Sequence, residues 1–239
     1  MLNVSMLSTA LAISLTLGPE PADDPLAAYT PREIAGFTVL VHPAADEDPR
    51  LARRVIAALT FDLELIVARV PEASLDTLRR TSIVVTPRTR AREGLSGRGM
   101  CFHASAGWLT ANGYDAAREG TVEILNMGDF LEWRAEQPMM TLHELAHAMH
   151  WRTGFDREDI RLAFEAARDA GRYEAVAHAL AGEGELRRAY AMVNDKEYFA
   201  ELSEAIFGRN DFFPFTADDL RAHDPDGYAV VARVWGLSL

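Results

Sequence analysis

The stretch His143-Glu144-Leu145-Ala146-His147 sets the expectations for the whole chain. On a helix the two histidines, four residues apart, project from one face and can bind a single Zn²⁺. Two imidazoles leave at least one coordination position for water, and the metal lowers the pKa of that water from 15.7 to about 7. Glu144 lies beside the histidines and is therefore the candidate general base.

The residues around this motif favour a helix from Pro138 to Trp151. Most of them are strong helix formers, none in the interior is glycine or proline, and a first helical turn tolerates Pro138. An apolar stripe beside the histidines predicts a largely buried helix, and it comprises Leu142, Leu145, Ala146 and Met149. This context matters because a motif with three fixed positions also arises by coincidence.

The same segment offers no convincing third ligand. The extended pattern H-E-x-x-H-x-x-G-x-x-H requires a histidine six residues after His147, and Thr153 stands there. His150 is separated from His143 by roughly 10.5 Å of helical rise. One zinc cannot readily bind both while keeping His147, so we interpret His150 as a rim or structural histidine.

A second predicted helix, in residues 194–204, carries the better candidate. Glu197 and Glu201 are one helical turn apart, so one carboxylate can bind zinc while the other accepts the outer N–H of a zinc histidine. Of the glutamates here only Glu197 has an acid four residues on, which makes Glu197 the ligand and Glu201 its outer partner. Alternatively, Asn194 and Glu197 form a capping box, and Glu201 and Glu204 lie on a solvated face.

HELAH followed by Glu-Tyr-Phe-Ala-Glu at residues 197–201 resembles the gluzincin metallopeptidases, and among them the catalytic domain of anthrax lethal factor and its bacterial relatives. Similar blocks occur at residues 102–109, 122–126 and 208–215, and the likeness extends over residues 33–239. The resemblance implies a zincin-like metallopeptidase domain of the α+β class, rich in helix, with a small mixed sheet and an HExxH active-site helix.

The resemblance also implies roles for individual residues. His143, His147 and Glu197 would bind one zinc per chain, Glu144 would be the base and Glu201 an outer partner. A tyrosine seven residues before the ligand glutamate would donate a hydrogen bond to the oxyanion, and Tyr190 stands at that position. The alternative for Tyr190 is an ordinary half-buried tyrosine.

Composition bounds the class of protein and its partners. The 239 residues, 49% of them hydrophobic, suffice for one sizeable core. A formal net charge of −12 disfavours nucleic acid and anionic membrane as partners and fits a neutral or basic polypeptide substrate better. Cys101 is the only cysteine, so the chain has no intrachain disulfide, and we interpret it as a small buried side chain.

The N-terminus predicts export to the periplasm or the medium. An apolar run from Met6 to Leu17, followed by small residues and prolines, resembles a signal peptide and is too short to span a bilayer. Residues 1–22 are then a leader, with a disordered start of a cytoplasmic protein as the alternative. Residues 23–32 form a linker, and residues 33–239 form one catalytic domain with an N-terminal α/β subregion (33–98) and a metal-site region (99–239).

Periodicity between and beyond these motifs predicts the remaining elements. Strands are expected at residues 37–41, 82–85 and 122–126, and helices at 49–68, 75–80, 159–170, 172–180, 216–219 onward and 225–235. The arginine-rich residues 88–98 are expected to be a surface loop. The strand at 122–126 precedes the metal helix. It is either a sheet edge against which an extended peptide pairs or simply a core strand, and the two interpretations are compatible.

Three functions are compatible with the motif. The first is a zinc-dependent endopeptidase or related peptide hydrolase, in which Glu144 activates water and Tyr190 helps hold the oxyanion. The second is a non-catalytic protein that keeps zinc for stability and binds a partner. The third is a zinc hydrolase of a non-peptide amide. No role follows from sequence for His103 or His223.

Overall fold

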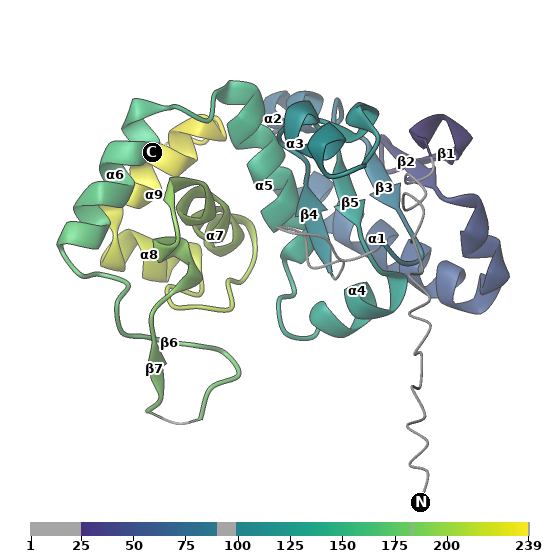
Figure 1. The fold of residues 1–239 in the computed structure, drawn as a ribbon. Helices are drawn as coiled ribbons and strands as arrows, with labels where there is room; N and C mark the ends of the chain where they lie inside the picture. Colours follow the sequence, from purple (N-terminus) through teal and green to yellow (C-terminus); the bar gives the residue numbers. More distant parts are fainter. Residues whose placement is uncertain (1–24, 90–98, 183, 239) are drawn as a thin grey trace, which may run out of the picture.

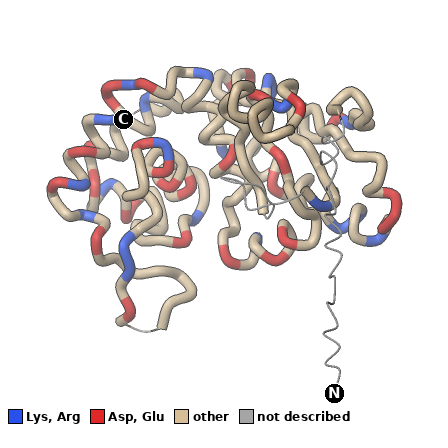
Figure 2. Tube along the Cα trace, viewed as in Figure 1, with Lys and Arg blue, Asp and Glu red and all other residues tan. Residues whose placement is uncertain are grey.

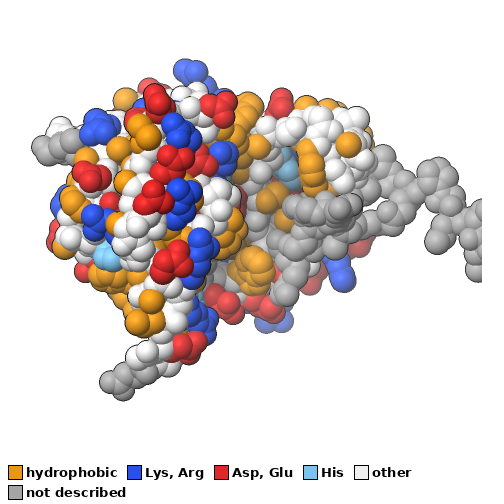
Figure 3. All heavy atoms as spheres, turned by 60° about the vertical axis from the view of Figure 1, so that its left-hand side comes forward, with side chains coloured by type: hydrophobic (Ala, Val, Ile, Leu, Met, Phe, Trp, Pro, Cys, Tyr) orange, Lys and Arg blue, Asp and Glu red, His pale blue; other side chains and the backbone are white. Residues whose placement is uncertain are grey.

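A small mixed sheet and a separate group of helices flank the helix that carries the HELAH motif. The computed structural model describes residues 25–89, 99–182 and 184–238. The fold is α+β and rich in helix, as predicted. One lobe contains the sheet with α1 to α4, the other contains α6 to α9, and α5 lies between them (Figure 1). Acidic and basic residues are interspersed over both lobes (Figure 2). On the surface of the lobe that contains α6 to α9, side chains of both charges lie next to one another (Figure 3).

The sheet contains five strands in the order β1-β2-β3-β5-β4. Their bounds are β1 Thr30–Ile34, β2 Phe37–Val41, β3 Ile83–Val85, β4 Met100–Phe102 and β5 Val122–Ile124. The central strands β2, β3 and β5 are parallel, and the two outer strands pair antiparallel to their neighbours. The residues of the three central strands are buried, except for the exposed Thr38 and the half-buried Leu40. They are also apolar, except for Thr38 and the buried Glu123.

Two of the predicted boundaries, the end of the linker and the border between the two subregions of the single domain, do not coincide with the elements of the fold. Residues 30–32 belong to β1, so the linker predicted for residues 23–32 extends too far. A division at residue 98 would cut the sheet, because β4 and β5 complete the layer begun by β1, β2 and β3. The predicted leader, residues 1–22, and most of the predicted loop at 88–98 lie outside the described residues.

Nine α-helices occur in the described ranges. They are α1 Pro49–Arg69, α2 Glu72–Leu78, α3 Ala106–Ala111, α4 Met127–Trp133, α5 Met140–Thr153, α6 Glu158–Asp169, α7 Asp195–Phe207, α8 Ala217–His223 and α9 Pro225–Val234. Short 3₁₀ turns are η1 Leu26–Ala28, η2 Pro43–Glu47, η3 Ala116–Arg118 and η4 Tyr190–Met192. None of these helices is both long and apolar enough to cross a membrane. The metal-motif helix begins at Met140, after Pro138 rather than at it.

The helix predicted at residues 172–180 is wrong. This segment instead contributes β6 (Val176–Ala177), which pairs with β7 (Leu186–Arg187). Main-chain hydrogen bonds from Ala179 N to Asp211 O and from Phe213 N to Ala177 O, both 2.8 Å long, tie it to a distant loop. These long-range bonds outweigh the local helix propensity of the segment.

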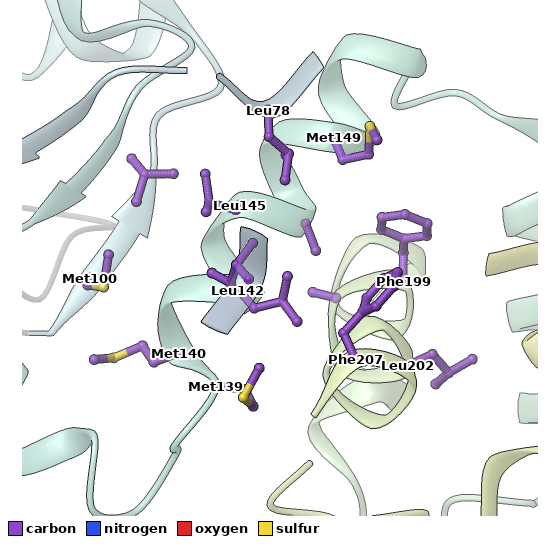
Figure 4. Packing of buried hydrophobic residues seen from close by; sticks show 14 of the residues in the cluster. Leu78, Met100, Met139, Met140, Leu142, Leu145, Met149, Phe199, Leu202 and Phe207 are labelled. Atoms are coloured by element: carbon purple, nitrogen blue, oxygen red, sulfur yellow. The ribbon is translucent and has the colours of Figure 1, made fainter. Parts of the chain in front are cut away.

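The core places α5 against α7. Leu142, Leu145 and Met149 of α5 and Phe199 and Phe207 of α7 belong to one buried cluster (Figure 4). Gly208, directly after α7, allows close approach to the segment before α5, since a Cβ there would lie 2.5 Å from Met139 Sδ. The beginning of α5 and the end of α7 are therefore held together, which fixes the two helices that carry the predicted ligands.

Candidate metal centre

Two histidines of α5 and one glutamate of α7 converge. His143 Nε2 lies 3.0 Å from Glu197 Oε2, and His147 Nε2 lies 3.2 Å from the same oxygen. The histidines are one helical turn apart and share a face of α5, while Glu197 occupies the first turn of α7. The structure thus brings together the three residues that the sequence nominated as ligands.

The capping alternative is correct for Asn194 and compatible with this site. Asn194 Oδ1 accepts hydrogen bonds from the main-chain N–H groups of Lys196 and Glu197, at 2.8 and 2.9 Å. The cap begins α7 and leaves the Glu197 side chain free to turn toward the histidines. A carboxylate in the first turn is also stabilised by the helix dipole.

The donor set fits a tetrahedral metal ion. Ligand atoms at 2.0–2.1 Å from such an ion lie about 3.3 Å apart, close to the two nitrogen–oxygen distances above. One ligand atom from each of His143, His147 and Glu197 lies within 4.8 Å of the other two, so the group could hold a metal ion. His143 is buried, and His147 and Glu197 are half-buried.

The carboxylate that orients His143 is Glu204, not Glu201. His143 Nδ1 donates to Glu204 Oε1 at 2.7 Å, whereas Glu201 Oε1 lies 3.9 Å away. Gln137 Nε2 donates to the same Glu204 oxygen at 2.9 Å. Glu204 follows Glu197 by seven residues, which is nearly two turns at about 3.6 residues per turn, so the two side chains lie on the same face of α7. The prediction considered only the spacing of four residues and so passed over it.

Glu201 has a different environment. Its Oε2 accepts a hydrogen bond from Asn210 Nδ2 at 3.1 Å. Burial, reinforced by the nearby Glu204 carboxylate, raises the pKa of Glu201 well above its ordinary value. His143, Glu201 and Glu204 form a second group that could hold a metal ion. The two groups share His143, and the contacts of the second one run through Nδ1.

Removing Glu204 is expected to weaken metal binding more than removing Glu201. Glu204→Ala deletes the acceptor of His143 Nδ1, and loss of such a partner costs about 10- to 100-fold in affinity. Glu201→Ala is a matched control, since both side chains are fully buried on α7. Competition with a chromophoric chelator measures both affinities. Equal losses, or a larger loss in Glu201→Ala, would contradict the assignment.

Charges around the ligands favour a deprotonated glutamate. Burial by itself would raise the pKa of Glu197, but hydrogen bonds from His143 and His147 hold it well below its usual range. Burial would lower the pKa of His143, but Glu197 and Glu204 outweigh burial and raise it well above the ordinary value. Without a metal, the pair of His143 and Glu197 therefore keeps a proton on the imidazole, and a cation that binds there would displace this proton.

A cavity of about 760 Å³ opens over this group. Glu144 and Tyr190 line it together with the two histidines and Glu197. The Tyr190 ring, in η4, is 47% exposed, and its centroid lies 6.2 Å from that of His143. Burial and the nearby Glu197 raise the pKa of Tyr190, so its hydroxyl keeps a proton to donate. The proposed base and the proposed oxyanion donor thus face the same space.

Sequence reasoning missed several residues that line this cavity or support it. Glu204 had a usable signal in its spacing of seven from Glu197. Gln137 and Asp211 had none, because each reaches the site from a loop through long-range packing. Residues 100–102 also line the cavity, from β4. Cys101 is among them, and burial, followed by the charge of Glu144, raises the pKa of its thiol well above the ordinary value.

The remaining histidines of interest lie outside the metal group. His103 Nε2 is 2.7 Å from Glu123 Oε2 in the buried part of the sheet lobe. His223 Nε2 lies 2.9 Å from the main-chain oxygen of Arg172. His150 is fully buried between the rings of Phe155 and Phe199, with centroids 5.2 and 5.1 Å away. It occupies the position of a structural histidine.

His150→Leu is expected to stabilise the protein at low pH. Neither ring nitrogen has a hydrogen-bond partner among the described residues, and burial lowers the pKa of His150 from 6.5 to about 4. Between these values the unfolded chain binds a proton that the folded chain excludes, so wild type loses stability as pH falls below 6.5. The variant avoids this loss, about 2 kcal/mol at pH 5.

Urea unfolding in the presence of a chelator measures the effect without interference from metal release. The difference in unfolding free energy between variant and wild type should grow as pH falls from 8 to 5. A difference that stays constant over this range would show that His150 does not titrate as its burial demands.

No family model, curated protein or solved structure matches this chain. What the site can do therefore follows from its own geometry. The group could hold a metal ion, and Glu144 lies beside it in the same cavity without belonging to it. Such an arrangement can remove a proton from water next to a bound molecule.

Proposed function

We propose that this protein is a zinc-dependent peptide hydrolase. The observation that carries the proposal is the convergence of His143 Nε2 and His147 Nε2 on Glu197 Oε2, in a cavity that Glu144 also lines. Two imidazoles and one carboxylate are the ligands of catalytic zinc sites that keep a position open. The test is cleavage of an unstructured protein by the zinc-loaded chain, with Glu144→Gln as the inactive counterpart.

In this proposal each side chain has one task. Zinc, when bound, would polarise the scissile carbonyl and acidify water. Glu144 accepts the proton of the attacking water and later delivers it to the leaving amine. Tyr190 donates a hydrogen bond to the oxygen on which negative charge develops. Glu204 acts through His143, because its carboxylate fixes which ring nitrogen faces the metal.

An extended polypeptide fits this site through β4. Of the two interpretations of residues 122–126, the sheet edge is wrong, because β5 lies between β3 and β4. Gly99 O accepts a hydrogen bond from Leu125 N, and His103 N donates one to Thr121 O, so every second residue of β4 is bonded toward β5. The main-chain N–H and C=O groups of Met100 and Phe102, which lie between them, therefore face away from β5. Those two residues also line the cavity, where they would pair with a substrate main chain.

A zincin-like fold is part of the proposal. A mixed sheet with an antiparallel outer strand beside the metal-motif helix supports it, as does the supply of Glu197 by a following helix. The non-catalytic alternative is less favoured, because a purely structural site needs neither a large open cavity nor a carboxylate such as Glu144 within it.

Tyr190→Phe is expected to lower kcat for peptide cleavage by about 10²- to 10³-fold with little change in KM. A donor that stabilises the oxyanion acts in the transition state, and its removal has effects of this size. Steady-state kinetics on one peptide measure both constants, with Tyr228→Phe on α9 as a control outside the cavity. A variant with normal kcat would exclude Tyr190 as the donor.

A further inference from the structure

A second, smaller cavity adjoins the metal-facing one at the end of β4. Its volume is about 240 Å³, and it is lined by residues 101–105 and by Trp108 and Leu109 of α3. Cys101 and Phe102 line both cavities, so the two cavities meet at β4. Cavities that hold whole small ligands span roughly 300–1,000 Å³, so this one has the size for a single side chain.

The walls of this cavity are apolar and fixed. Trp108 is 36% exposed and stacks on Tyr114, with ring centroids 5.8 Å apart. Leu109 is 1% exposed and closes the inner side of α3. Ala104 contributes a small side chain, which leaves the space between strand and helix unfilled. A preformed apolar wall with an indole face suits an aromatic or large aliphatic side chain.

The two polar side chains of the lining, His103 and Ser105, each have a hydrogen-bond partner within the protein. His103 Nε2 is held by Glu123 Oε2 at 2.7 Å, and Ser105 Oγ accepts from Trp108 N at 3.2 Å. The Glu123 carboxylate is in turn paired with Arg118 Nη1 at 2.8 Å. A charged occupant would therefore lose its hydration without gaining an ion pair, whereas an apolar occupant would not.

The position of the cavity identifies the occupant as part of the polypeptide substrate. A main chain paired with the side of β4 that faces away from β5 advances about 3.3 Å per residue, with side chains alternating between the two faces. A chain that crosses the metal group along β4 therefore brings one of its side chains to the small cavity within a few residues of the scissile bond.

We infer that the cavity bounded by Phe102, Ala104, Trp108 and Leu109 is a specificity pocket for one large apolar side chain of the substrate. This inference rests on the proposed peptide hydrolase function. The pocket selects among polypeptides by excluding charge and by requiring a large apolar residue at one fixed distance from the bond that is cut.

Cleavage of a diverse peptide library by the zinc-loaded full chain, read by mass spectrometry, tests the pocket. Wild type should enrich Phe, Trp, Leu or Met at one position near the bond. Replacing that residue by Ala in a matched peptide should lower kcat/KM by about tenfold or more, as expected for losing a buried apolar side chain. In the Trp108→Ala variant, the two peptides should have nearly equal kcat/KM, and the variant should still cleave the alanine peptide.

A second variant fills the pocket instead of opening it. Ala104→Trp should shift the preference at that position to Gly and Ala, so the inference stays testable if Trp108→Ala folds poorly. Phe61→Ala is the control, because Phe61 is 61% exposed on α1 and lines neither cavity. Zinc content and circular dichroism report whether each variant keeps its site and fold.

The outcomes separate the pocket from the hydrolase. Cleavage by wild type without an apolar preference, or a preference unchanged in both pocket variants, overturns the pocket and leaves the hydrolase standing. Zinc-loaded wild type that cleaves no peptide overturns the hydrolase and the pocket with it.

Discussion

Glu144→Gln is expected to abolish peptide cleavage, with kcat reduced by roughly 10²- to 10⁴-fold, while zinc stays bound. Glutamine keeps the shape of the side chain but cannot accept the proton of the attacking water, and general-base catalysis is worth a factor of this size. Glu144 lines the cavity yet is absent from both groups that could hold a metal. The loss should therefore appear in turnover and not in metal content.

The comparison needs a control that changes charge alone. Glu64→Gln removes one carboxylate from an exposed position of α1 and should leave kcat and zinc content unchanged. Single-turnover kinetics with saturating enzyme separate chemistry from substrate binding. Normal turnover by Glu144→Gln would exclude this glutamate as the base.

Glu197→Ala is expected to lower zinc affinity by more than about a hundredfold. Loss of an outer partner alone costs about 10- to 100-fold, and Glu197 contributes both a ligand atom and a negative charge. The variant leaves only His143 and His147 of the three converging residues. Zinc competition titrations at several fixed pH values measure the affinity, because a proton on His143 competes with zinc and each comparison must hold that competition constant.

A matched truncation on another helix provides the reference. Glu158→Ala removes a carboxylate from the first turn of α6, where its side chain is 78% exposed, and should bind zinc like wild type. Wild-type affinity in Glu197→Ala would mean that the metal is held elsewhere, for instance by Glu201 and Glu204.

The local part of the site was predictable from sequence. The spacing of His143 and His147 requires only a helix, and the residues around the motif form one. Asn194 marks the beginning of α7, which places Glu197 in its first turn. Both inferences use contacts within a few residues, where helix geometry alone determines which side chains share a face.

Features that depend on long-range pairing were not predictable. β4 has three residues, too few for a recognisable alternation, and its place beside β5 depends on pairing between strands some 20 residues apart. Residues 172–180 are rich in helix formers, yet their main chain bonds to residues 211–213. Glu204 rather than Glu201 reaches His143 because of how α7 rotates against α5, and packing sets that rotation.

The most direct test of the account is anomalous diffraction at the zinc absorption edge from a crystal of the zinc-loaded protein. One strong peak is predicted, about 2.0–2.2 Å from His143 Nε2, His147 Nε2 and a Glu197 oxygen. No peak at full zinc loading, or a peak held by Glu201 and Glu204 on the Nδ1 side of His143, would contradict the account.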